Sequence, residues 1–122
     1  MRTRNKPIPE SQIPEWVYVG LHADWYYGFE GMKTRAIRDN GFVPGQRTLL
    51  SGRRDSVYVA TTYQRALAYA NLYGKPLVLK ISTAGLDKTR FFYDPMDAVP
   101  SGHDAVQFEY RDNIPPSAIC FM

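Results

Sequence analysis

Three side chains that lie far apart along the chain have the chemistry expected of a catalytic site. His22 follows an apolar stretch, Tyr58 lies inside the run Val57–Ala60, and Glu109 lies in an alternating segment. A carboxylate can accept a proton and stabilise developing positive charge, and an imidazole can bond a hydroxyl group. A tyrosine can stack flat on a ring while its polar tip stays hydrated. These residues form the candidate catalytic set.

Each of these residues also has an ordinary structural explanation. Glu109 fits the solvated face of an amphipathic strand, Tyr58 fits a sheet core, and His22 fits the polar end of a strand. Tyr69 likewise fits a helix that covers a core. The catalytic interpretation therefore requires that the candidate residues meet in one cleft.

Several common kinds of site are excluded by motif. The chain has no G-x-G-x-x-G and no G-x-x-x-x-G-K-[ST], so the usual cradles for dinucleotides and triphosphates are missing. Its only histidines, His22 and His103, do not form an H-x-x-x-H pair, and no metal is expected. The single cysteine, Cys120, cannot form an intramolecular disulfide and is expected to be a buried thiol.

The composition is that of an ordinary globular domain, with 44% hydrophobic and 22% charged residues in 122. No run of 18 apolar residues and no apolar core of a signal peptide is present, so a cytoplasmic location is expected. The net charge is +3 but unevenly spread. Residues 1–54 hold nine Lys/Arg against five Asp/Glu, which suggests an anionic ligand on one side of the fold.

Residues 1–15 are expected to form a flexible N-terminal arm, because three prolines interrupt them, and residues 16–122 a single domain. Apolar patterns predict strands at 16–22, 57–60, 76–81, 91–93, 105–110 and 118–121, and helices at 29–40 and 65–73. Thr61 or Thr62 is the expected cap of the second helix, and Gly74 its end. The predicted fold class is α+β, with an antiparallel core of short strands and two principal helices in the first half.

The segment Ser56–Ala70 resembles the strand and helix of ADP-ribosyltransferases of the diphtheria-toxin and poly-ADP-ribose-polymerase type. Those enzymes carry a tyrosine in an apolar tetrapeptide and a second one eleven positions later, here Tyr58 and Tyr69. Two further stretches are similar to the family's strand ending in His-Gly and to its glutamate strand with a closing I-P-P-x-x-I, namely Val19–Ala23 and Gln107–Ile119. The resemblance spans residues 16–122 and implies the family's split antiparallel core.

The resemblance implies transfer of ADP-ribose from NAD, as co-substrate, to a protein or nucleic acid. Loss of nicotinamide places positive charge on the ribose, as in glycoside hydrolysis, and a nearby carboxylate stabilises it. The implied roles are Glu109 at the cation, His22 at a ribose hydroxyl, Tyr58 and Tyr69 on the ring, the Ala23 backbone at the carboxamide and Gln107 at the acceptor. Charge alone suggests Arg35, Arg38, Arg53 or Arg54 for the pyrophosphate, and Arg53 and Arg54, in a basic loop, are also candidates for the acceptor.

Two positions depart from the family pattern. The family's glycine after the histidine is Ala23 here, and its serine on the helix is Ala66, so one hydrogen bond to the carboxamide is lost. Either Thr61 or Thr62 replaces it, or the ring is held more weakly. Two alternatives stay open: a non-catalytic module that binds nucleic acid or protein, and an enzyme like the NAD-dependent RNA 2′-phosphotransferases, whose arginine-rich pattern is absent. Retention of the three candidate catalytic residues favours the transferase over the binding module. For such a compact chain, the resemblance allows a toxin, effector or phage-related role.

Overall fold

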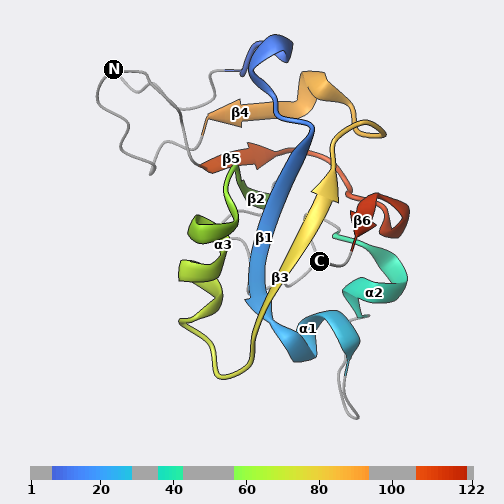
Figure 1. Cartoon of the computed structure of the whole chain (residues 1–122). Helices are drawn as coiled ribbons and strands as arrows, with labels where there is room; N and C mark the ends of the chain where they lie inside the picture. Colours follow the sequence, from blue (N-terminus) through green and yellow to red (C-terminus); the bar gives the residue numbers. More distant parts are fainter. Residues whose placement is uncertain (1–6, 29–35, 43–56, 94–106, 121–122) are drawn as a thin grey trace.

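A computed structural model describes residues 7–28, 36–42, 57–93 and 107–120 of the chain. Within these residues, six strands form one antiparallel sheet in the order β4-β5-β2-β1-β3-β6 (Figure 1). The strands are β1 (Trp16–His22), β2 (Val57–Ala60), β3 (Pro76–Ser82), β4 (Phe91–Tyr93), β5 (Gln107–Tyr110) and β6 (Ile119–Cys120). The helices are α1 (Ala23–Tyr27), α2 (Ile37–Asn40) and α3 (Tyr63–Ala70), with short 3-10 turns η1 (Glu10–Gln12), η2 (Lys88–Arg90) and η3 (Pro116–Ala118). The predicted α+β class and antiparallel pairing are confirmed.

The sheet consists of two halves that meet at a single register pair. β1 pairs with β3 along its whole length, and β3 pairs with β6. In the other half, β5 pairs with both β2 and β4. Between the halves, β1 and β2 share only the pair Tyr18 and Ala60. Because the ladder does not continue from this pair toward Gly20 and Tyr58, the sheet opens between β1 and β2.

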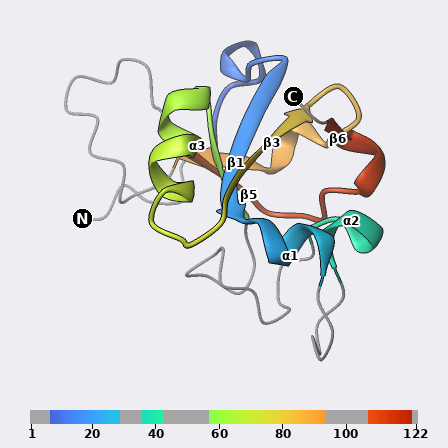
Figure 2. The same cartoon turned by 60° about the horizontal axis from the view of Figure 1, so that its bottom comes forward.

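The two faces of the sheet carry different layers. Alternate residues of β1, namely Val17, Val19 and Leu21, are buried in the main apolar core, as the period of a strand requires. Helices α1 and α2 contribute Tyr26 and Ile37 to that core. Helix α3 lies on the opposite side of the sheet (Figure 2), where small side chains pack against it. Gly20, Tyr58 and Glu109 belong to the strand faces on the α3 side.

Helix α3 approaches β1 closely because both surfaces are small. Ala66 and Ala70 are fully buried, and a Cβ atom at Gly20 would lie only 1.9 Å from the Ala66 carbonyl oxygen. Thr62 caps the helix by accepting the N–H of Arg65 at 3.2 Å, so the predicted cap is confirmed. This close contact fixes where side chains on α3 stand over the sheet.

The predicted helices differ from the observed ones in their bounds. A continuous helix over 29–40 is wrong, since Ala36 is extended (ψ 142) and helix α2 begins only at Ile37. Residues 29–35 lie outside the described residues. Helix α3 ends at Ala70, before the predicted 73, because Leu72 and Tyr73 donate to the residues three positions earlier and tighten the last turn. Helix α1 was not predicted, and Cys120, expected to be buried, is only half-buried.

Part of the expected N-terminal arm contacts the sheet. Pro7 forms a bridge to Phe92, and the N–H of Ile8 donates to the carbonyl of Phe91 at 2.9 Å. Farther along, the hydroxyl of Thr83 donates to the carbonyl of Pro14 at 2.6 Å. From Pro7 onward this segment is therefore packed, while residues 1–6 lie outside the described residues.

Candidate active site

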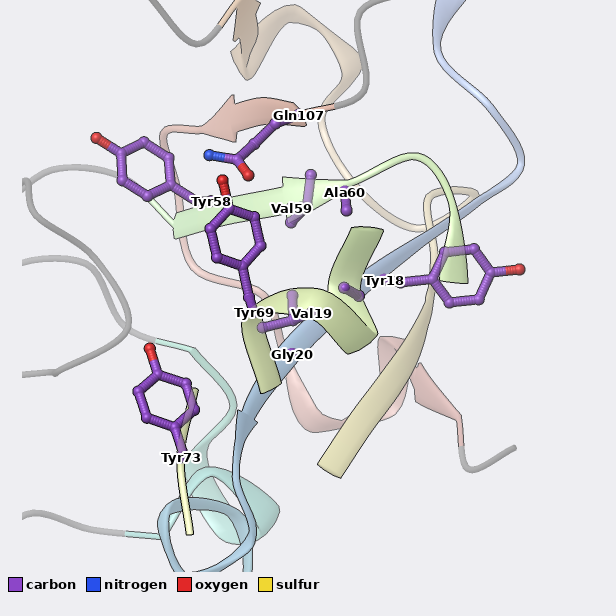
Figure 3. A pocket seen from close by; sticks show the side chains of 10 residues that line it. Tyr18, Val19, Gly20, Tyr58, Val59, Ala60, Tyr69, Tyr73 and Gln107 are labelled. Atoms are coloured by element: carbon purple, nitrogen blue, oxygen red, sulfur yellow. The ribbon is translucent and has the colours of Figure 1, made fainter. Parts of the chain in front are cut away.

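A hollow opens where β1 and β2 separate, on the face that α3 covers (Figure 3). Its volume is about 410 Å³, including space open to solvent. The lining consists of Tyr18, Val19 and Gly20 from β1, Tyr58, Val59 and Ala60 from β2, Ala66 and Tyr69 from α3, Tyr73 and Gln107. The lining is mainly aliphatic and aromatic with one side-chain amide, a composition typical of small-molecule sites.

Two tyrosines from different elements stand at this hollow. Tyr69 rises from α3 with its hydroxyl directed toward the side chain of Gln107, and the ring of Tyr58 lies beside it (Figure 3). Tyr58 is half-buried, and Tyr69 is 37% exposed. A flat ligand that entered here would meet aromatic rings, with an amide able to donate and accept hydrogen bonds at one end. The structure thus brings together three of the residues predicted from the sequence.

Glu109 lies beside the hollow without lining it. It is directly opposite Tyr58 in the antiparallel ladder, and it shares a face with Gln107, two positions earlier. Its side chain is 0% exposed, so the explanation of Glu109 as a solvated strand residue is wrong. A buried carboxylate is costly unless it is paired. Arg111 supplies the opposite charge: its Nε and Nη2 donate hydrogen bonds to Oε1 of Glu109 at 3.2 and 3.1 Å.

Arg111 was not predicted as a site residue. Its guanidinium lies 4.1 Å from the centre of the Phe92 ring, and its backbone N–H donates to the carbonyl of Arg90 at 3.0 Å. The signal that was available is the spacing Q-x-E-x-R, which puts three polar residues on one face of an extended segment. Spacing alone did not reveal that this face would be buried.

His22 stands at the junction of β1 and α1. Its Nδ1 accepts the N–H of Asp24 at 3.0 Å and so caps α1. A neutral imidazole that accepts at Nδ1 carries its proton on Nε2, which is then a donor. His22 does not line the hollow, but it shares a strand face with Gly20, which does. The ring centre of Trp25 lies 5.6 Å from that of His22 and 4.8 Å from that of Tyr73, which reaches the lining.

The other residues predicted for the site do not line the hollow or lie outside the described residues. The backbone N–H of Ala23 donates to the carbonyl of Lys75 at 2.7 Å, so this donor is already used within the fold. Thr61 precedes the cap of α3 and is absent from the lining of the hollow. Arg35, Arg53 and Arg54 lie outside the described residues. The roles suggested for these five residues stay predictions.

Comparison with known proteins adds no family assignment. A scan of protein-family models and a search of curated proteins both gave no match to this chain. Among the described residues, no helix has both the length and the apolar character needed to cross a bilayer. Evidence about function therefore comes from the geometry of the site itself.

Proposed function

We propose that this protein is an NAD-dependent mono-ADP-ribosyltransferase, with the split antiparallel core of the diphtheria-toxin and poly-ADP-ribose-polymerase type. The observation that carries the proposal is the register pair of Tyr58 and Glu109, next to a hollow that Tyr69 and Gln107 also line. Cleavage of the nicotinamide–ribose bond needs a holder for a flat ring and a fixed negative charge beside the sugar. Aromatic side chains and a carboxylate on one sheet face supply both.

In the proposed reaction, nicotinamide enters the hollow beside Tyr58 and Tyr69. The bond between ribose C1′ and the ring nitrogen breaks, the electron pair leaves with nicotinamide, and positive charge develops on the sugar. Once the groups that cover it have moved, Glu109 stabilises this cation and accepts a hydrogen bond from the ribose 2′-hydroxyl, while Nε2 of His22 donates to a ribose hydroxyl. A nucleophile of the protein or nucleic-acid acceptor then bonds to C1′ and releases its proton. Gln107 contacts that acceptor.

A second candidate function is a non-catalytic module that binds a nucleic acid or protein in the same hollow. The observation that favours it is the complete burial of the Glu109 carboxylate under an ion pair with Arg111. A sugar hydroxyl reaches this carboxylate only if the groups that cover it move. In this alternative the ion pair is structural, and the tyrosines bind a base or an aromatic side chain without a reaction.

Incubation with NAD labelled in its adenylate part separates the two candidates. The protein is mixed with a cell lysate, with or without prior nuclease treatment, and free nicotinamide and labelled macromolecules are measured. Transfer predicts nicotinamide release and labelled protein or nucleic acid, both lost in a folded Glu109→Ala variant. No release by the folded wild-type protein would favour the binding module. Loss of label only after nuclease treatment would identify the acceptor as nucleic acid.

A further inference from the structure

The carboxylate of Glu109 is held through one of its two oxygens. Both hydrogen bonds from Arg111, from Nε at 3.2 Å and from Nη2 at 3.1 Å, go to Oε1. The Glu109 side chain is 0% exposed and that of Arg111 is 18% exposed. An ion pair with this burial is shielded from water and salt far more than a surface pair. The positive charge of Arg111 therefore lies close to the Glu109 carboxylate, and the two hydrogen bonds fix the orientation of that carboxylate.

Arg111 is itself fixed on two further sides. Its guanidinium lies over the ring of Phe92, which is directly opposite Glu109 in the ladder between β4 and β5. Its backbone N–H is bonded to the carbonyl of Arg90. The Phe92 ring and the Glu109 carboxylate hold the guanidinium, and the backbone hydrogen bond holds the main chain that carries it. The side chain therefore has little rotational freedom left to lose when a ligand binds. The pairing of β4 with β5 thus holds the ion pair of Glu109 and Arg111 in place before any ligand binds.

We propose that Arg111 is a positioning residue that keeps the Glu109 carboxylate ionised and oriented toward the sugar, and this inference rests on the proposed function. An adjacent fixed cation favours the charged form of a carboxylate, and burial alone favours the neutral form. Among the described residues, Tyr58 on β2 and Phe92 on β4 stand opposite Glu109 in the ladders, Gln107 precedes it on the same face, and Arg111 is bonded to its carboxylate. Arg111 is the cation in that set.

The test measures the charge of Glu109 directly. The titration of its side-chain carboxyl is followed by ¹³C NMR in the wild-type protein and in Arg111→Gln, and nicotinamide release from NAD is followed over the same pH range. Loss of the cation is expected to raise the pKa of Glu109 and to move the acidic limb of kcat to higher pH by the same amount. Arg90→Gln is the matched control, because the Arg90 guanidinium is a neighbouring charge that pairs with Asp87, at 3.9 Å, and not with Glu109.

Arg111→Lys keeps the charge but loses the fork of two donors, and it serves if Arg111→Gln does not fold. It is expected to keep the acidic limb near its wild-type position while kcat falls roughly ten- to a hundredfold through misorientation. An unchanged Glu109 titration in folded Arg111→Gln, with an active wild-type protein, would overturn this inference alone. A wild-type protein that releases no nicotinamide would overturn the proposed function. The ion pair of Glu109 and Arg111 would then have no catalytic role.

Discussion

Tyr58 on β2 and Glu109 on β5 stand directly opposite each other in an antiparallel ladder of four register pairs. Directly opposed residues have Cβ atoms about 4.5–5.5 Å apart and project from the same face. The register is held by their neighbours, since Val59 and Phe108 pair on the other face and are buried in the main core. A slip by one residue would exchange the two faces and bury apolar groups where the hollow is. Packing of the core thus keeps the phenol and the carboxylate together.

Glu109→Gln tests the carboxylate with little change in shape. If Glu109 stabilises the sugar cation, kcat for nicotinamide release falls roughly 10²–10³-fold, because the interaction exists mainly in the transition state. The Kd for NAD changes little. Steady-state rates, NAD titration and a circular dichroism spectrum of the variant check this together. Wild-type turnover in a folded variant would contradict the catalytic role and favour the binding module.

Tyr58→Ala tests whether this ring contacts the bound ligand. Loss of a stacked ring is expected to weaken NAD binding by about 1–3 kcal/mol, measured by calorimetry. Tyr58→Phe keeps the ring and is expected to bind almost as tightly as the wild-type protein. Tyr27→Ala is a matched control, since Tyr27 is 46% exposed and does not line the hollow. Equal binding by Tyr58→Ala and the wild-type protein would remove Tyr58 from the site.

The strands were easier to predict from the sequence than the helices, because their residue types and patterns can be recognised within a few neighbouring positions. Apolar alternation in Trp16–His22 and the run Val57–Ala60 were enough to predict β1 and β2. Helix α1 has three aromatic residues in five, which are weak helix formers, and it depends on its cap from His22. The extended Ala36 interrupts what an apolar period predicted as one helix.

The candidate site was partly predictable for a related reason. The spacing of Tyr58 and Tyr69 is typical of a strand followed by a helix that folds back on it. Both elements lie within one short segment of the sequence, so the pattern could be recognised there. The burial of Glu109 depends instead on β4 and β2 pairing on either side of β5, far away in sequence. The position of the Arg111 guanidinium depends on Phe92 in the same way. No local pattern reports such contacts.

Tyr110→Phe tests how the stability of the protein depends on alkaline pH. Burial raises the pKa of Tyr110 above its ordinary value of 10.0, although the N–H of Asp87, which its hydroxyl accepts at 3.1 Å, acts to lower it. With a folded pKa above the unfolded one, the phenol's contribution to stability is complete below the ordinary pKa and is lost as pH rises through the folded pKa. Wild-type stability therefore falls in alkaline solution more steeply than that of Tyr110→Phe.

Urea unfolding at neutral pH and above the ordinary tyrosine pKa measures this difference. At neutral pH the variant is expected to be less stable by about 1 kcal/mol, because the hydrogen bond to Asp87 is lost. The gap between the two proteins should narrow at alkaline pH. Parallel curves at all pH values would show that Tyr110 does not titrate differently in the folded and unfolded states.

Gly20→Ala tests the contact that places α3 over the sheet. The new Cβ would lie 1.9 Å from the carbonyl oxygen of Ala66 and 2.9 Å from the backbone nitrogen of Ala70. Backbone atoms of a helix cannot rotate away as a flexible side chain can, so α3 must shift as a unit. The free energy of unfolding is expected to fall by about 3 kcal/mol or more.

Gly85→Ala is the matched control for this substitution, because nothing lies within 4 Å of its added Cβ. Its stability is expected to stay within about 0.5 kcal/mol of the wild-type value. Any folded Gly20→Ala protein should also bind NAD more weakly than Gly85→Ala, since a shift of α3 moves Tyr69 relative to Tyr58 across the hollow. If Gly20→Ala matched Gly85→Ala in both stability and NAD binding, α3 would not rest on β1 as described, and the placement of Tyr69 at the hollow would lose its basis.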